Sequence, residues 1–283
     1  KVIDYCRLNQ IPLIYASSAA IYGNLEVSDD LDSKIDLLSP YASDKYMLEI
    51  YAKTAYKNFQ LSSIGLRFFN VYGPRQDPNN PYSGVISIFI DRLLDNKNIT
   101  INGGDQTRDF IYVQDVVKVI FKSVVLTKSS KVCEQVNVLT GKSISIDKLA
   151  TLLMEKITLN VEKEYSILSK GDPKGSEGTT KKIENLLKID VNDMVSIEDG
   201  LSKTIKFIID EWANYFLKKP KGFLFLIKNT INKQSNFAFQ IFSNKKLTVL
   251  KMNLIVGIDA SRNRSGGAIA HIIGILTEFD PLK

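Results

Sequence analysis

Histidine is nearly absent from this chain of 283 residues, since His271 is the only one. A single histidine excludes a multi-histidine metal site and leaves little room for a histidine-based catalytic triad, so we expect no bound metal. Cys6 and Cys133 cannot build a disulfide framework and favour a reducing, cytoplasmic compartment. No apolar run approaches the roughly 20 residues of a membrane span, and residues 1–6 read as the middle of a helix rather than a signal peptide.

Acidic residues are missing from one long stretch. Between Ala213 and Lys251 there are eight lysines and no aspartate or glutamate, so the net charge of +6 is concentrated there and the rest of the chain is slightly acidic. A nucleic-acid-binding protein usually spreads its basic residues over a folded face. We therefore predict a basic linker at 218–251 and no nucleic-acid partner. A weaker alternative is that this Lys- and Phe-rich stretch binds an anionic membrane surface.

The first two thirds of the chain alternate short β-rich runs with amphipathic helical patterns. Alternation of this kind favours an α/β fold with a mostly parallel sheet. The predicted strands are 12–17, 61–69, 99–101, 110–113 and 134–139. The predicted helices are 41–58, 87–94, 115–125, 146–157 and one that begins near Ser196.

Tyr41 and Lys45 lie one helical turn apart on the same face of the predicted helix 41–58. A nearby ammonium group favours the phenolate and lowers the pKa of a tyrosine from its ordinary value of about 10. Such a tyrosine can take a proton from a substrate hydroxyl and return it. Tyr215 and Lys219 show the same spacing without any other catalytic signal. The spacing alone therefore leaves open an exposed helix pair.

Hydroxyl groups end the strand that precedes this helix. Ser17 and Ser18 stand at its carboxyl end, which is where open α/β sheets bind ligands. The alternative is that these small residues only satisfy the loop backbone.

Five motifs in a fixed order carry a resemblance to a known family. They are SSAAIYG at 17–23, PYASDK at 40–45, LRFFNVYGPRQ at 66–76, PYSGVI at 81–86 and GDQTRDF at 104–110. Over residues 1–217 the chain resembles the extended short-chain dehydrogenases/reductases, and within them the NAD-dependent epimerases and dehydratases of nucleotide sugars. The resemblance implies a Rossmann-like, doubly wound parallel sheet and a smaller α/β lobe that binds the nucleotide sugar.

The resemblance also implies a role for each matching residue. Ser18, Tyr41 and Lys45 would be catalytic, and Tyr41, Lys45, Ser17 and Phe68 would contact the cofactor NAD. The residues implied to bind the substrate are Asn70, Val85, Ile86, Thr100, Asn102 and Arg108. Of these, Asn70 and Arg108 would hold the diphosphate, a task that suits a guanidinium group.

Structural roles compete with several of these assignments. Arg67 and Asp109 could form an ion pair, Asn70 could cap a turn, and Val85 and Ile86 could belong to the core.

The reaction type is indicated by two short segments. Ala19 and Ala20 stand where sugar-nucleotide dehydratases carry an acid and a base, and alanines cannot move protons. The segment 76–83 resembles that of UDP-glucose and UDP-N-acetylglucosamine 4-epimerases. The resemblance therefore implies epimerisation of a UDP-hexose or UDP-N-acetylhexosamine through transient oxidation at C4, in surface-polysaccharide biosynthesis. Relatives pair through the helix that holds Tyr41, so a homodimer is expected.

The chain departs from the family at two places. No glycine-rich dinucleotide motif precedes Ser17, which predicts an N-terminally truncated epimerase that binds NAD poorly and turns over little. Lys174 stands where relatives often carry arginine. The alternative from another class is an inactive gene-fusion fragment that keeps only nucleotide-sugar binding.

The last 32 residues show a separate pattern. Residues 254–260 predict a buried strand, Gly266 and Gly267 a turn, and residues 268–276 an apolar helix. This segment resembles the first strand, turn and helix of a GT-B glycosyltransferase, which implies the start of a second Rossmann-like domain at 252–283.

Overall fold

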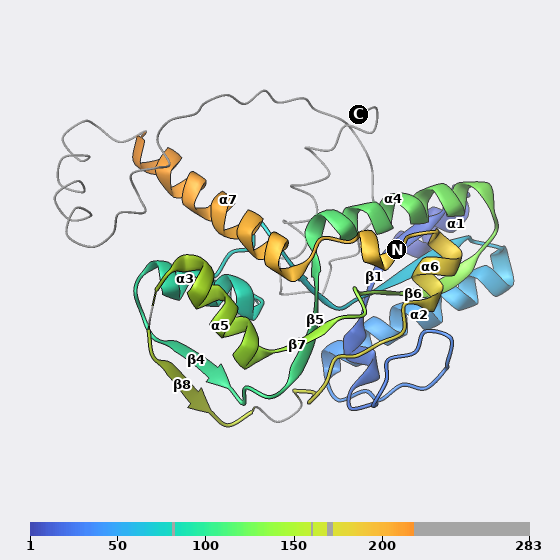
Figure 1. Ribbon diagram of the computed structural model, residues 1–283. Helices are drawn as coiled ribbons and strands as arrows, with labels where there is room; N and C mark the ends of the chain where they lie inside the picture. Colours follow the sequence, from blue (N-terminus) through green and yellow to red (C-terminus); the bar gives the residue numbers. More distant parts are fainter. Residues whose placement is uncertain (81–82, 160, 169–171, 218–283) are drawn as a thin grey trace.

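The computed structural model describes residues 1–80, 83–159, 161–168 and 172–217, with the backbone alone for 212–217. The predicted linker 218–251 and the predicted strand, turn and helix of 252–283 lie outside these described residues. The elements form two groups that lie side by side along the long axis in Figure 1.

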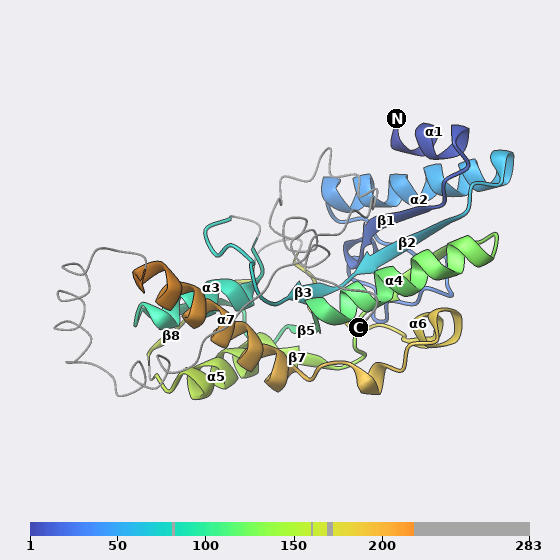
Figure 2. The same ribbon diagram turned by 90° about the horizontal axis from the view of Figure 1, so that it is seen from above.

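The first group is built around a parallel sheet with the strand order β1-β2-β6. Helices α1 and α2 cover one face of this sheet and helices α4 and α6 cover the other, as Figure 2 shows. The strands are β1 (Leu13–Ser18), β2 (Ser63–Phe68) and β6 (Cys133–Val138). The helices are α1 (Val2–Leu8), α2 (Pro40–Phe59), α4 (Val113–Ser129) and α6 (Lys181–Leu187), and a short 3-10 turn η1 (Ala19–Tyr22) follows β1.

The second group holds two smaller sheets, of strand order β3-β5-β7 and β4-β8. Only the β5–β7 pairing is antiparallel in the described part of the chain. The strands are β3 (Asn70–Tyr72), β4 (Ile99–Asn102), β5 (Thr107–Tyr112), β7 (Ser143–Ser145) and β8 (Lys163–Ser166). The helices are α3 (Val85–Leu94), α5 (Ile146–Ile157) and α7 (Ile197–Leu217), preceded by the turn η2 (Val191–Asp193).

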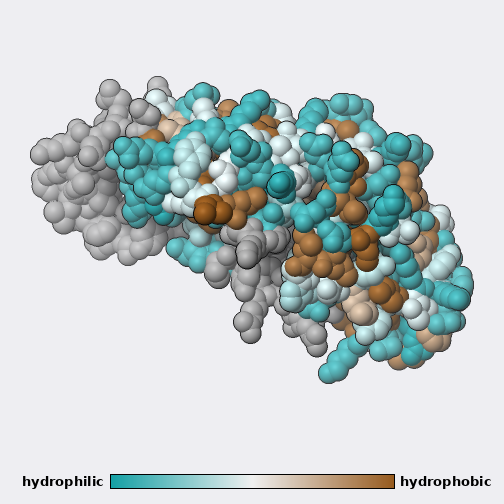
Figure 3. Space-filling view, turned by 90° about the horizontal axis from the view of Figure 1, so that it is seen from below, coloured by the Kyte–Doolittle hydropathy of each residue, from teal (hydrophilic) through white to brown (hydrophobic). Residues whose placement is uncertain are grey.

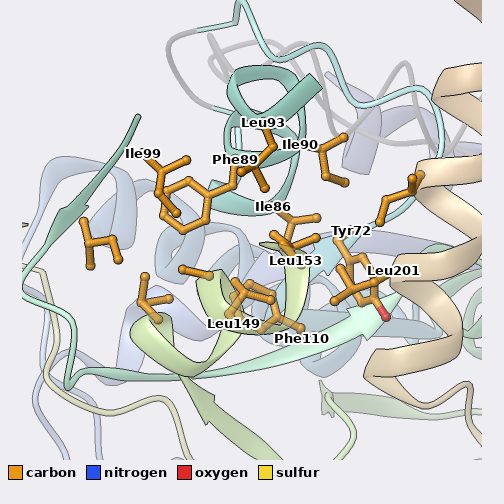
Figure 4. Packing of buried hydrophobic residues seen from close by; sticks show 14 of the residues in the cluster. Tyr72, Ile86, Phe89, Ile90, Leu93, Ile99, Phe110, Leu149, Leu153 and Leu201 are labelled. Atoms are coloured by element: carbon orange, nitrogen blue, oxygen red, sulfur yellow. The ribbon is translucent and has the colours of Figure 1, made fainter. Parts of the chain in front are cut away.

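A hydrophobic core in the second group joins its helices to its strands. Ile86 of α3, Leu149 of α5 and Leu201 of α7 are at most 1% exposed and pack in one cluster with Tyr72 and Phe110. Figure 4 shows these side chains pointing toward one another between the three helices. A separate cluster of aliphatic side chains lies between the β1-β2-β6 sheet and α4 and α6.

The predicted α/β class and the mostly parallel pairing are confirmed. Helix α2 begins as predicted, because the Ser39 hydroxyl accepts a hydrogen bond from the Ala42 amide and Pro40 is tolerated at the first helical position. The structure adds β3, β7, β8 and α6, which the sequence pattern does not predict. The added strands have three or four residues, which is too short for a periodic signal.

Candidate active site

The carboxyl end of β1 carries the first predicted site residue. Ser18 is buried and caps the turn η1, since its Oγ accepts a hydrogen bond of 3.1 Å from the Ala20 amide. The backbone of Ser18 is still extended, with φ −149° and ψ 145°, so the strand runs up to this hydroxyl before the chain turns. A buried side-chain hydroxyl therefore stands at the sheet edge where ligands bind in α/β folds.

Tyr41 stands in the first turn of α2, and Ser18 is the side chain that acts on its phenol by hydrogen bonding. Removal of the phenol from water raises the pKa of Tyr41 above its ordinary value, and the hydrogen bond with Ser18 lowers it in part. The net direction is the opposite of the predicted one. Tyr41 as a whole residue is 42% exposed, so it can be reached from outside.

Lys45 lies one turn further along α2 and is buried. Its Nζ donates a hydrogen bond of 3.1 Å to the Ala16 carbonyl of β1 and lies 5.7 Å from the centroid of the Tyr41 ring. The alternative of an exposed helix pair is therefore wrong for Lys45. The structure brings Ser18, Tyr41 and Lys45 together at one strand end, and their catalytic role stays a prediction.

A cavity of about 230 Å³ opens beside Ser18. Three further predicted residues line it: Phe68 at the end of β2, Asn70 of β3 and Arg108 of β5. The Nδ2 of Asn70 donates to the Asp109 carbonyl at 3.0 Å and lies 3.5 Å from Ser176 Oγ. Asn70 thus bonds to the neighbouring strand β5 and to the distant Ser176, and it also lines the cavity.

Arg108 is 9% exposed and keeps a carboxylate beside it. Its Nη2 donates to Asp172 Oδ1 at 2.5 Å and its Nη1 donates to the Thr107 carbonyl at 2.7 Å. Asp172 and Ser176 also line the cavity, but the sequence pattern does not single them out. The only available signal is their place in the segment 171–176, where Lys174 marks the departure from the family. Lys174 is exposed and is not among the residues that line the cavity.

Ser17 is the first predicted residue that the structure places elsewhere. It is 2% exposed, and its hydroxyl donates to Glu49 Oε1 at 2.6 Å. The predicted contact with the cofactor is therefore not supported for this side chain, because its donor already serves a buried carboxylate.

The other four residues predicted to bind the substrate, Val85, Ile86, Thr100 and Asn102, are not among those that line the cavity. Ile86 is 1% exposed within the core shown in Figure 4, and Val85 packs against that core, so the structural alternative holds for both side chains. Thr100 and Asn102 lie on the exposed side of β4, where their side chains bond to β8. The Ile86 side chain is enclosed by apolar neighbours, so its burial favours the structural alternative over a substrate contact.

Arg67 and Asp109 do not pair with each other, so the predicted structural ion pair is wrong. Arg67 pairs with Glu49, their Nη2 and Oε2 atoms lying 2.8 Å apart. Asp109 is fully buried and accepts hydrogen bonds from the Thr140 amide at 2.9 Å, the Thr140 hydroxyl at 3.0 Å and the Lys142 amide at 3.1 Å. Burial raises the pKa of Asp109 to about 6, although these donors lower it in part.

The raised pKa of Asp109 predicts a pH-dependent contribution to stability. Because its pKa is higher in the folded than in the unfolded state, the folded state holds this proton more tightly between about pH 4 and pH 6. The contribution is therefore complete at low pH and is lost as the pH rises through 6, by up to about 3 kcal/mol. Asp109→Asn does not titrate, so the stability of the unsubstituted chain relative to this variant should fall over that range. Urea unfolding at pH 4, 5, 6 and 7 measures it, and a difference that grows with pH would contradict the assignment.

Within the described part of the chain, no cluster of three or more histidine, cysteine, aspartate or glutamate side chains could hold a metal ion. In the same part, no helix is long and apolar enough to cross a membrane.

A parallel α/β sheet with a serine at a strand end and a Tyr-x-x-x-Lys helix beside it defines a short-chain dehydrogenase/reductase type of site. The model of the NAD dependent epimerase/dehydratase family matches residues 1–138 of this chain. The solved UDP-N-acetylglucosamine 4-epimerase of Methanobrevibacter ruminantium is 31% identical, with a TM-score of 0.66 over 74% of this chain and 67% of that one. The solved UDP-glucose 4-epimerase of Thermotoga maritima is 30% identical, with a TM-score of 0.68 over 75% of this chain and 68% of that one. The chain belongs to the NAD-dependent epimerase/dehydratase family.

The curated relatives give the same picture. A putative UDP-glucose 4-epimerase of Methanocaldococcus jannaschii is 34% identical over 199 residues, which is 69% of this chain. An uncharacterised UDP-glucose epimerase of Bacillus subtilis is 30% identical over 210 residues. The matched part spans 62% and 64% of the length of these two relatives.

Proposed function

We propose that residues 1–217 carry the catalytic and substrate-binding side chains of an NAD-dependent UDP-sugar 4-epimerase. The observation that supports this most is that Ser18, the side chain that lowers the pKa of Tyr41 by hydrogen bonding, lines the same cavity as Asn70 and Arg108. Groups that can transfer a proton and groups that can bind a diphosphate would then contact the same substrate molecule. The names of the relatives agree, since they act on or bind UDP-glucose and UDP-N-acetyl sugars.

The side chains around Tyr41 fit the nicotinamide end of NAD in part. Lys45 and Tyr41 offer a cation and a phenol at the strand end, and Phe68 adds an apolar wall of the cavity. Ser17 is not in this set because its hydroxyl is used by Glu49. NAD, when bound, supplies the acceptor and donor of hydride at the sugar carbon.

The protein residues then handle the proton and the substrate. Tyr41 takes the proton from the sugar O4 and returns it, and Ser18 holds that oxygen by a hydrogen bond. Arg108 and Asn70 bind the diphosphate, where a guanidinium group can form two parallel bonds. Ala19 and Ala20 also line the cavity and bring no acid or base, which supports epimerisation over elimination of water.

The identity of the sugar, hexose or N-acetylhexosamine, and the role in surface-polysaccharide biosynthesis stay predictions. Turnover of UDP-glucose and UDP-N-acetylglucosamine with added NAD tests the reaction and the substrate together. UDP-sugar binding without any NAD binding or turnover would instead favour the alternative of an inactive nucleotide-sugar-binding fragment.

Arg108→Lys is expected to weaken UDP-glucose binding by about 10- to 100-fold, since a lysine keeps the charge but loses the paired donors. Isothermal titration calorimetry measures the affinity. The matched control is Arg92→Lys on α3, because the Nε of Arg92 donates to the Asn98 carbonyl at 2.6 Å and the residue does not line the cavity. Equal binding by the Arg108 variant and the unsubstituted chain would contradict the diphosphate role.

Pairing with a second copy through α2 also stays a prediction. Met47, Ile50 and Tyr51 are exposed on this helix, by 45%, 39% and 56%. Figure 3 shows hydrophobic residues gathered on the half of the molecule that holds the β1-β2-β6 sheet and its helices. Sedimentation equilibrium of the chain would contradict the homodimer if only the monomer mass is found at micromolar concentration.

A further inference from the structure

Glu49 of α2 is a fully buried carboxylate that is not among the residues proposed to transfer protons or to bind the substrate or the cofactor. Its Oε1 accepts hydrogen bonds from Ser17 Oγ at 2.6 Å and from Arg67 Nε at 2.9 Å. Its Oε2 accepts from Arg67 Nη2 at 2.8 Å. A fork-to-fork pair of this kind is directional as well as strong, so it fixes the orientation of the carboxylate that meets Ser17.

Each of the three guanidinium nitrogens of Arg67 also donates a hydrogen bond. Arg67 lies directly beside Ser17 in the register of β1 and β2. Its remaining Nη1 donates to the Tyr22 hydroxyl at 2.6 Å, and that hydroxyl donates to Asn137 Oδ1 at 2.8 Å. Buried polar groups that are all satisfied form a rigid unit. Glu49 is therefore held from β2 and β6 while it holds β1.

The contacts of the neighbouring β1 residues complete a pattern. Lys45 Nζ donates to the Ala16 carbonyl at 3.1 Å, and Ser18 is the side chain that lowers the pKa of Tyr41 by hydrogen bonding. Together with the bond from Ser17 to Glu49, the last three residues of β1 interact with residues on three successive turns of α2. Ser18 lines the cavity, and Ser17 is not among its lining residues.

We propose that Glu49, oriented by Arg67, is a positioning residue that acts through the Ser17 hydroxyl to hold Ser18 at the Tyr41 hydroxyl. This inference rests on the proposed function for its catalytic meaning. The arrangement of Ser18 and Tyr41 themselves can be measured without substrate or NAD. Ser17 would then hold the end of β1 in position through Glu49, in place of the predicted contact with the cofactor.

The test follows the effect of Ser18 on the pKa of Tyr41 without any turnover. A 3-fluorotyrosine placed at position 41 gives one fluorine signal and a more acidic phenol, so its pKa can be titrated by ¹⁹F NMR. Because the Ser18 hydrogen bond lowers the pKa of Tyr41, loosening that bond must raise it. Ser17→Ala is expected to raise the pKa at position 41 by about 0.5 to 1.

The matched control is Ser63→Ala, which removes another fully buried serine of the same sheet. Ser63 pairs with Leu13 at the opposite end of β1, and its hydroxyl contacts Cys133 Sγ at 3.7 Å. Its removal is expected to leave the pKa at position 41 unchanged. An unchanged pKa in Ser17→Ala, or an equal rise in Ser63→Ala, would overturn the proposal.

Glu49→Gln tests whether Glu49 acts through Ser17. We expect the pKa at position 41 to rise in Glu49→Gln, and to rise no further in the Ser17→Ala/Glu49→Gln double variant. Additive effects would overturn the path through Ser17. If Glu49→Gln does not fold, Ser17→Ala alone still decides. Failure of UDP-sugar turnover would count against the proposed function. It would not affect the test of Glu49 and Ser17, because the pKa titrations use no substrate or NAD.

Discussion

Tyr41→Phe is expected to lower kcat for UDP-sugar epimerisation with saturating NAD by about 10²- to 10⁴-fold. The substitution removes only the hydroxyl on which Ser18 acts and keeps the ring against which Lys45 lies. Binding of UDP-glucose should stay close to that of the unsubstituted chain, because Arg108 and Asn70 are untouched. Steady-state kinetics and calorimetry on the same preparations measure the two quantities.

The control for this result is Tyr51→Phe on the same helix. Tyr51 is 56% exposed and lies beyond Lys45, so kcat should be unchanged. Equal kcat for Tyr41→Phe and the unsubstituted chain would remove the proton-transfer role from Tyr41. No turnover in the unsubstituted chain with saturating NAD would count against the proposed function itself.

Arg67→Met is expected to lower the free energy of unfolding by about 3 to 5 kcal/mol, the cost of leaving a buried charge without its partner. Glu49 is fully buried and Arg67 has a side chain that is 5% exposed, so water cannot replace the lost guanidinium group. Urea unfolding followed by circular dichroism measures the change. The Glu49→Met/Arg67→Met double variant should recover part of the loss, because no charge then stays buried.

An exposed ion pair provides the comparison. Lys97 Nζ lies 2.7 Å from Asp95 Oδ2, but the two side chains are 62% and 41% exposed. Lys97→Met should therefore cost less than about 1 kcal/mol. A loss for Arg67→Met as small as this would show that the buried pair contributes little.

Local pattern was enough to predict most of the regular structure. Ser39 and Pro40 mark the start of α2, and Ser196 caps α7 by accepting from the Asp199 amide at 3.1 Å. Residues 146–157 form α5 with the predicted bounds. These elements could be predicted because their caps and apolar periods lie within a few residues of sequence.

The candidate site was predictable only in part. Ser18, Tyr41 and Lys45 meet because one strand and the following helix hold them. Asn70 and Arg108 line the same cavity as Ser18. The partners of Arg108 and Asn70 lie far along the chain, at Asp172 and Ser176, and no local pattern couples such positions. Ile86 was predicted to bind the substrate because it lies in a family motif, but its side chain packs in the hydrophobic core.

The sequence by itself determined the α/β class, the helix that carries Tyr41 and Lys45, and the strand end that carries Ser17 and Ser18, because these depend on residues close along the chain. Only the tertiary structure decided that Ser17 faces Glu49 while Ser18 faces Tyr41, and that Arg67 pairs with Glu49 rather than Asp109. The physical reason is that a buried donor or charge must find a partner in space. Which partner it finds depends on how strands and helices from distant segments pack.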